Sequence, residues 1–161
     1  MLISQVMQKK VITLKPEDTL RDIAQKFSDH DISGAPVVDI NKHVVGILSE
    51  ADILNTLKKH QKELRMVYIS PSTGMVGLSF REKNVDKETE VVFSELGNIT
   101  AQDMMKRDVI TVSPDDELQV VVEIIAKGKI NRVPVVKNGK LAGIVTRGDI
   151  IRAMSKGAMR P

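Results

Sequence analysis

Apolar residues recur along the chain with spacings that predict both helices and strands. Four apolar residues between positions 20 and 27 follow the spacing i, i+3, i+4 and i+7, and four between 118 and 125 repeat it. This spacing places apolar side chains on one face of a helix. The short runs Pro-Val-Val at 36–38 and 134–136 indicate buried strands instead. The same helix and strand patterns thus occur in both halves of the chain.

Further strands are predicted on either side of these elements. Val-Ile-Thr runs at 11–13 and 109–111 predict a strand before each helix, since Pro and acidic residues, which signal a helix start, follow both runs. Apolar runs at 44–48 and 141–145 predict a return strand in each half. The turn before the second return strand contains Asn-Gly at 138–139, a strong hairpin signal.

A second helix closes each unit, so the predicted order β-α-β-β-α occurs twice. These helices begin at the Ser/Thr-x-x-Asp motifs 49–52 and 146–149. The two halves align at an offset of 98, which becomes 97 after one residue is lost. We therefore divide the chain into a first repeat (1–57), an insert (58–100) and a second repeat (101–161). Neither repeat is large enough to bury a good core alone, so we expect an α+β fold in which the two pack together.

The insert has no counterpart elsewhere in the chain. We predict that the helix entering it continues to about residue 68, that a turn lies at 71–74 and a short strand at 75–80, and that a short helix spans 91–96. Because it breaks the symmetry of the repeats, the insert is our candidate for contact with a protein partner.

Composition narrows the class of protein. The 161 residues are 42% hydrophobic and 28% charged, enough for a real core, and with 2% aromatic residues that core must be aliphatic. The absence of Cys excludes a disulfide scaffold, Cys-ligated metals and a thiol nucleophile. No apolar run approaches the length of a membrane span, and no signal-peptide pattern is present, so we expect a cytoplasmic protein without a membrane segment.

No pattern of catalytic or metal-binding residues appears in the sequence. His30, His43 and His60 lack metal-ligand spacing, and the acidic pairs at 17–18 and 115–116 follow proline, where a first helical turn favours carboxylates. There is also no phosphate loop, dinucleotide turn or nucleophile elbow. We predict that the chain is not an enzyme, holds no metal and requires no cofactor.

Three motifs of the second repeat carry a resemblance to a known family. They are Val-Ile-Thr-Val-Ser-Pro at 109–114, Asn-Arg-Val-Pro-Val-Val at 131–136 and Gly-Ile-Val-Thr-Arg-Gly-Asp-Ile at 143–150, and each has a partner in the first repeat. In order, spacing and duplication they resemble the CBS domain, and the chain is similar to a stand-alone pair. The resemblance implies a pseudo-two-fold pair that binds adenine-containing ligands, such as AMP, ADP, ATP or S-adenosylmethionine, in clefts between the repeats. It also implies a homodimer of such pairs.

The resemblance assigns roles to the Ser/Thr-x-x-Asp motifs. It makes Thr146 a phosphate-side residue and Asp149 the acceptor for both ribose hydroxyls, with Ser49 and Asp52 at the same positions of the first repeat. The same residues also fit a simple helix cap, in which the hydroxyl caps the helix and the carboxylate favours its first turn. The two interpretations are compatible, because a helix N-terminus also attracts anions.

The strand motif supplies the other predicted contacts. The resemblance implies that the backbone around Val133 reaches the adenine edge while apolar side chains clamp its faces, and that Arg132 meets a phosphate, for which its planar fork is suited. The alternative is a loop that enters a buried strand, with Arg132 in solvent. The remaining ligand-binding candidates are Thr13, Ser33, Ala35, Pro36, Thr111, Asn131, Pro134 and Arg147.

The two predicted ligand sites differ in charge. Arg132 and Arg147 of the second repeat stand where the first has Gly34 and Glu50. We expect the second-repeat site to prefer a nucleotide, and the first-repeat site to be empty or to take an uncharged nucleoside or a cationic adenosyl compound.

The function predicted from the sequence is a non-enzymatic sensor. Ligand binding in this module would change the contacts of a dimer or of an unidentified protein target. One alternative is a structural dimerisation module with degenerate ligand sites. The other is a nucleic-acid-associated protein, given a net charge of +3 and a pI of about 9.1, although no clustered basic run supports it.

Overall fold

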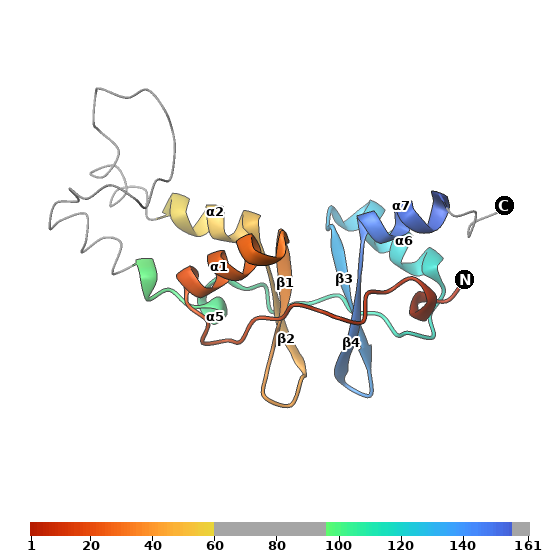
Figure 1. Cartoon of the computed structure of the whole chain (residues 1–161), viewed down its shortest axis with the longest axis horizontal. Helices are drawn as coiled ribbons and strands as arrows, with labels where there is room; N and C mark the ends of the chain where they lie inside the picture. Colours follow the sequence, from red (N-terminus) through yellow and green to blue (C-terminus); the bar gives the residue numbers. More distant parts are fainter. Residues whose placement is uncertain (60–95, 156–161) are drawn as a thin grey trace, which may run out of the picture.

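The computed structural model describes residues 1–59 and 96–155 (Figure 1). The predictions for residues 60–95 lie outside the described residues. Within the described ranges, no helix combines the length and the apolar character needed to cross a bilayer.

The duplicated order of helices and hairpins is confirmed. The first repeat contains α1 (Leu20–His30), β1 (Gly34–Val38), β2 (Val44–Ser49) and α2 (Glu50–Lys59). The second contains α6 (Leu118–Gly128), β3 (Arg132–Lys137), β4 (Lys140–Thr146) and α7 (Arg147–Ser155). Each repeat begins with a short helix, the 3-10 helix η1 (Ile3–Gln5) in the first and α5 (Ala101–Met104) in the second.

Local residue chemistry sets the ends of the long helices. At the start of α1, Thr19 accepts a hydrogen bond from the Asp22 backbone N–H (3.3 Å), and the Asp22 carboxylate accepts one from the Thr19 backbone N–H (2.9 Å). This reciprocal pair satisfies donors that the first helical turn leaves free. The chain then leaves α1 through Asp31 and α6 through Lys129, both in the left-handed region with φ near 50°. Each helix is thereby turned back toward the strand that follows it.

The strands form two separate antiparallel hairpins, β1 with β2 and β3 with β4. The strands predicted at 11–13 and 109–111 are not formed, and the residue after each run makes a single bridge instead. Only Leu14 pairs with Val37, and only Val112 pairs with Val135, each as one parallel bridge. Proline follows two residues later in both repeats, and because it has no backbone N–H to donate, the ladder cannot extend beyond the bridge toward the helix.

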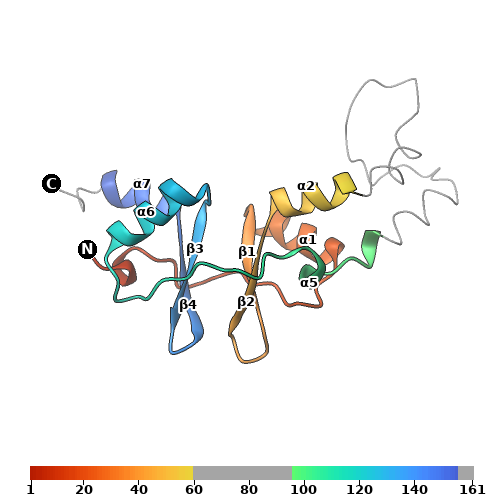
Figure 2. The same ribbon diagram turned by 180° about the vertical axis from the view of Figure 1, so that it is seen from behind.

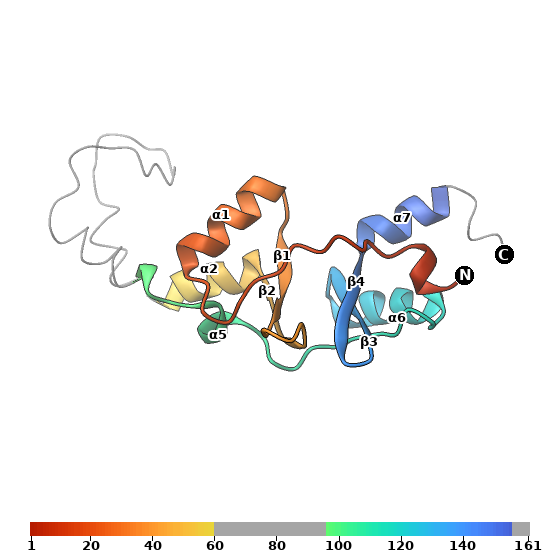
Figure 3. The ribbon, with the colours of Figure 1, turned by 60° about the horizontal axis from the view of Figure 1, so that its bottom comes forward.

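The first residues of each repeat, 1–12 and 101–106, form a crossing segment that packs on the other repeat. Gln8 exchanges two backbone hydrogen bonds with Ile144 of β4 (2.9 and 3.0 Å), and Lys106 exchanges two with Ile47 of β2 (2.9 Å each). Ile3 is fully buried in the core of the second repeat, whereas Met104 lies in the core of the first. The N-terminal segment can be followed across the molecule from the first repeat to the second (Figure 3).

A glycine on each return strand makes room for the crossing segment. A Cβ atom on Gly46 would lie 2.3 Å from Sδ of Met105, and one on Gly143 would lie 2.7 Å from Sδ of Met7. Both distances are far below ordinary van der Waals contact, so a larger residue would displace the methionine. The pairs Gly46–Met105 and Gly143–Met7 are equivalent in the two repeats, which confirms the pseudo-symmetry.

Each repeat has its own aliphatic core, as the composition predicted. Buried Leu, Ile and Val side chains predominate in both cores, and Phe27 is the aromatic member of the first. The two hairpins lie side by side with their turns at the same end, and the long helices lie toward the other end (Figures 1 and 2). The hairpins also touch directly, because the Leu141 backbone N–H donates to the carbonyl oxygen of Lys42 (2.9 Å).

Candidate functional site

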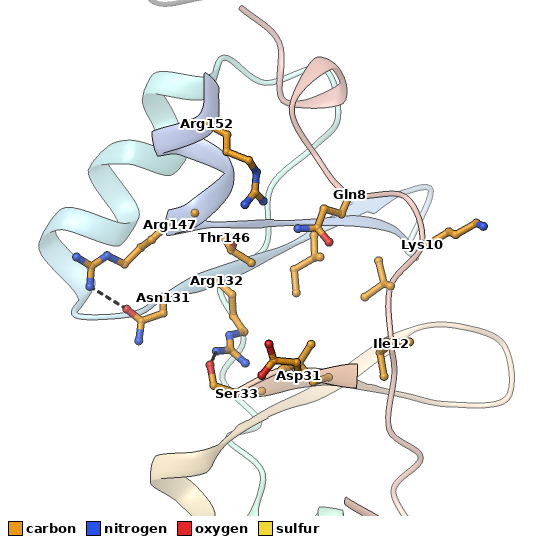
Figure 4. Close-up of a pocket in the computed structure, with 15 residues that line it drawn as sticks. Gln8, Lys10, Ile12, Asp31, Ser33, Asn131, Arg132, Thr146, Arg147 and Arg152 are labelled. Carbon is orange, nitrogen blue, oxygen red and sulfur yellow. Dashed lines mark hydrogen bonds between the residues drawn. The ribbon is translucent and has the colours of Figure 1, made fainter. Parts of the chain in front are cut away.

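A cleft of about 610 Å³ lies between the two repeats, within the size range of small-molecule sites. Segments from distant parts of the chain line it: residues 8–12 of the crossing segment, 31–34 at the end of α1 and start of β1, 131–132 at the start of β3, and 144–152 of β4 and α7. Figure 4 shows these side chains converging from both repeats. Neither repeat forms this cleft alone.

Basic side chains predominate among the charged groups that line the cleft. Lys10, Arg132, Arg147 and Arg152 line it, together with the acidic Asp31. Arg147 donates a hydrogen bond from Nη1 to the side-chain oxygen of Asn131 (3.3 Å), another residue of the lining. Such a group of cations favours a ligand with an anionic group, and guanidinium forks suit phosphate in particular.

The helix α7 begins beside the cleft with a fully satisfied cap. Oδ2 of Asp149 accepts hydrogen bonds from the Thr146 backbone N–H (2.8 Å) and the Thr146 hydroxyl (2.7 Å). Oδ1 accepts from Nε2 of Gln8 (2.9 Å) and from Nη2 of Arg152. The carboxylate is 4% exposed. Burial alone would raise the pKa of Asp149, but these hydrogen bonds outweigh it and hold the pKa below its usual value.

The first repeat carries the equivalent cap at the start of α2. Oδ2 of Asp52 accepts from the Ser49 backbone N–H and hydroxyl (2.8 Å each). Lys106 stands where Gln8 stands in the second repeat, with its Nζ 3.7 Å from Oδ1 of Asp52. The helix-cap interpretation of both Ser/Thr-x-x-Asp motifs therefore fits the structure. The N-terminal segment of the first repeat thus reaches Asp149 of the second, and the first residues of the second repeat reach Asp52 of the first.

Arg132 extends from β3 across the interface to the first repeat. Its Nη2 donates to Oγ of Ser33 (2.5 Å), while Nη1 is buried and finds no hydrogen-bond partner among the described residues. Burial lowers the pKa of Arg132, and the negative charges of Glu50 and Asp52 partly offset this shift. Arg132 is thus a cation between the repeats with donor capacity left over.

The structure brings five of the predicted ligand-binding residues together in the cleft lining: Ser33, Asn131, Arg132, Thr146 and Arg147. Asp149 adjoins them through its hydrogen bonds to Thr146. Four others, Ala35, Pro36, Val133 and Pro134, are buried within β1 and β3 and do not line the cleft. Thr13 and Thr111 also lie outside the lining, although Val11 and Ile12 belong to it. Ser49 and Asp52 belong to the cap of the first repeat.

Sequence reasoning missed several residues of the cleft: Gln8, Lys10, Asp31 and Arg152. Arg152 carried a usable signal, because it follows Asp149 by three residues and helical positions i and i+3 are neighbours. Gln8 and Lys10 precede the Val-Ile-Thr run at 11–13, and they reach the second repeat only because the N-terminal segment crosses to it. In the described ranges, no cluster of three or more His, Cys, Asp or Glu side chains is placed to hold a metal.

Comparisons with known proteins agree with this architecture. The family model described as the CBS domain matches residues 3–59 and 101–156. The uncharacterized protein MJ1426 of Methanocaldococcus jannaschii is 34% identical over 155 residues, which cover 96% of this chain and 91% of the relative.

Two solved complexes share the fold over almost the whole chain. The CBS domain pair of protein MJ0100, in complex with 5'-methylthioadenosine and S-adenosyl-L-methionine, has a TM-score of 0.70 at 23% identity, and 98% of both chains is covered. CBSX2 in complex with AMP has a TM-score of 0.70 at 22% identity, again with 98% of both chains covered.

Proposed function

The chain belongs to the CBS domain family, and from this premise we propose that it is a regulatory module that binds an adenosine-containing ligand in the cleft between its repeats. The observation that carries the proposal is the cleft itself, in which four basic side chains stand beside a capped aspartate. The solved complexes of MJ0100 and CBSX2 support the class of ligand, since their ligands all contain adenosine.

The two oxygens of Asp149 suit different tasks in this proposal. Oδ2 is held by the cap of α7, and removing it would leave helical donors free. Oδ1 is held by two long side chains, Gln8 and Arg152, which can rotate away. In the complex a ribose hydroxyl donates to Oδ1 in place of Gln8 and Arg152, while Oδ2 keeps the cap. Arg152 is then free to bind the phosphate.

The basic residues favour a phosphorylated ligand in this cleft. Arg147 and Arg152 are largely exposed, so a phosphate reaches them without deep burial. Arg132 offers a buried Nη1 with spare donor capacity. Charge-assisted hydrogen bonds of this kind are about twice as strong as neutral ones. We therefore place the phosphate of AMP, ADP or ATP near these three guanidinium groups.

The first repeat carries two carboxylates at the equivalent positions, and one of them, Asp52, has Lys106 at 3.7 Å. Glu50 and Asp52 begin α2 where the second repeat has Arg147 and Asp149. Two carboxylates repel a polyphosphate and attract a cation. We propose that the equivalent cleft of the first repeat takes a neutral nucleoside or a cationic adenosyl compound such as S-adenosylmethionine.

We also propose that the protein acts as a homodimer of CBS pairs. Leu54 on α2 and Ile151 on α7 occupy equivalent positions and are 63% and 64% exposed. Beside Ile151, an apolar groove lies between α6 and α7, lined in part by Val122, Ile125 and Met154. Exposed apolar faces of this kind mark association surfaces. Ligand binding changes the relative orientation of the repeats, and hence of these faces, if it favours one orientation over another.

A thermal-shift screen tests the proposal. The purified chain is heated with AMP, ATP, S-adenosylmethionine, GTP or duplex DNA, and a ligand that binds the folded state raises the Tm. We expect shifts with the adenosine compounds and none with GTP or DNA. A shift with DNA alone, abolished by moderate salt, would instead support the nucleic-acid alternative. No shift with any compound would support a purely structural module.

A further inference from the structure

Positions 34 and 132 are equivalent in the two repeats, and the structure brings them into contact. A Cβ atom built on Gly34 would lie 1.8 Å from Nη1 of Arg132 and 2.7 Å from the carbonyl oxygen of Leu48. Real Cβ atoms do not approach other atoms this closely, so Gly34 is what admits the Arg132 guanidinium. Two long side chains cannot share this space. Of the two equivalent positions, only one therefore carries a cation, Arg132.

Arg132 lies between basic residues on one side and carboxylates on the other. On one side Arg132 lines the cleft together with Arg147 and Arg152 (Figure 4). On the other side, Ser33 joins Arg132 to the start of α2: its hydroxyl accepts from Arg132, and its carbonyl oxygen accepts from the Glu50 backbone N–H (3.0 Å). The negative charges of Glu50 and Asp52 there oppose the effect of burial on the pKa of Arg132. Arg132 accordingly belongs to the electrostatic surroundings of both proposed ligand positions.

We propose that Arg132 couples the two clefts, so that a cation bound beside Glu50 and Asp52 tightens the binding of a phosphate beside Arg147. This inference rests on the proposed function. A phosphate in the cleft attracts the Arg132 guanidinium and shares its charge, which leaves Glu50 and Asp52 less well compensated even with Lys106 3.7 Å from Asp52. A ligand cation beside those carboxylates restores the compensation. The coupling is reciprocal, because each ligand must change the affinity of the other by the same factor.

Two related ligands separate charge from shape in the test. S-adenosylmethionine carries a sulfonium cation, whereas S-adenosylhomocysteine lacks one methyl group and that positive charge but is otherwise the same molecule. We expect saturating S-adenosylmethionine to tighten AMP binding about fivefold, at the lower end of typical coupling between sites. S-adenosylhomocysteine at saturation should change AMP affinity less than about twofold, since its sulfur is neutral.

Calorimetric titration of the full chain with AMP measures this effect. Arg132→Gln should abolish the dependence on S-adenosylmethionine. Arg152→Gln is the matched control, because it removes a guanidinium from the same cleft while leaving the link to Glu50 and Asp52 in place. That variant should bind AMP more weakly yet keep the dependence. The proposal is overturned if the AMP affinity of Arg132→Gln still depends on S-adenosylmethionine, or if that of wild type does not. It is also overturned if S-adenosylmethionine weakens AMP binding by competing for one cleft.

A second measurement needs no ligand and separates this inference from the proposed function. Thermal unfolding of Arg132→Gln, Glu50→Gln and the double variant forms a double-mutant cycle. We expect Arg132→Gln to lower the Tm by less when Glu50 is already Gln, because the pair has then lost its attraction. Strictly additive shifts would overturn the role of Arg132 as a link. If the cycle shows coupling but no adenosine compound binds wild type, the proposed function fails and ligand coupling fails with it, while the electrostatic link stands.

Discussion

At the scale of single residues, Asp149 and Asp52 have the same cap but different neighbours. Asp149 is paired with Arg152 and lies beside a cleft lined by cations. Asp52 has Lys106 at 3.7 Å and follows Glu50 by two residues. Because the caps are the same and only Asp149 adjoins the basic cleft, the two aspartates are a matched pair for testing which cleft prefers a nucleotide.

We expect Asp149→Ala to weaken AMP binding about tenfold or more and Asp52→Ala to weaken it less than about threefold. A hydrogen bond to a charged group contributes about 1.5–3 kcal/mol, and only Asp149 adjoins the basic cleft. Titration calorimetry on both variants measures the two affinities. Each substitution also removes one helix cap, so comparable falls in Tm, of a size expected for about 1 kcal/mol, serve as the internal control. Equal losses of affinity would contradict the asymmetry.

Sequence reasoning identified part of the candidate cleft at this scale. Thr146, Arg132 and Asp149 stand in local motifs, and a motif keeps its residues together whatever the rest of the chain does. Gln8 and Arg152, which hold Oδ1 of Asp149, belong to no motif shared by the two repeats. The place of Gln8 depends on packing between segments that are distant in sequence, which periodicity does not report, whereas Arg152 lies three residues after Asp149 on the same helix.

At the scale of elements, the exchange of segments ties the repeats together. Residues 1–8 contribute Ile3 to the second core and two backbone hydrogen bonds to β4. Residues 101–106 do the same for the first core and β2. The extreme N-terminus is therefore part of the packing of the C-terminal half.

Truncating Ile3 tests this exchange. We expect Ile3→Ala to destabilise the fold by about 2–4 kcal/mol, as for a fully buried core side chain, although it is the third residue of the chain. Denaturant unfolding measures the change. Leu2→Ala is the control: Leu2 is 41% exposed, and the change should cost well under 1 kcal/mol. An Ile3→Ala effect as small as that of the control would show that the segment does not pack on the second repeat in solution.

The duplicated helices and hairpins were predictable because their periodicity is local. The crossing was not, because the two repeats are too alike. Met7 fits against Gly143 and Met105 against Gly46, but the sequence alone permits each methionine to meet the glycine of its own repeat equally well. Only the lengths and directions of the connecting segments decide between the two arrangements. The Val-Ile-Thr runs were predicted as strands because their residues have high β propensity. Propensity does not show whether a run pairs with another strand.

At the scale of the whole molecule, the two repeats present a pair of equivalent apolar positions to solvent. Leu54 and Ile151 lie on α2 and α7, the last helices of their repeats. A two-fold dimer uses the same surface on both subunits, and a pseudo-symmetric pair offers that surface twice.

Charging these helices tests the proposed dimer. We expect wild type to have twice the 17.8 kDa mass of one chain in size-exclusion chromatography with light scattering, and the double variant Leu54→Asp, Ile151→Asp to run as a single chain. Burying an unpaired carboxylate in an interface is strongly unfavourable. Ile40→Asp is the control, because Ile40 lies between β1 and β2 and is 97% exposed. A dimer that survives in the double variant would show that another surface joins the subunits.

The most direct measurement is a crystal structure of the full chain grown with AMP. The account predicts the nucleotide in the cleft between the repeats, with a ribose hydroxyl on Oδ1 of Asp149 in place of Gln8 and Arg152. Its phosphate should lie within hydrogen-bond distance of Arg147 or Arg132, and the cap between Thr146 and Asp149 should be unchanged. A nucleotide found beside Glu50 and Asp52, or outside the clefts altogether, would contradict the account.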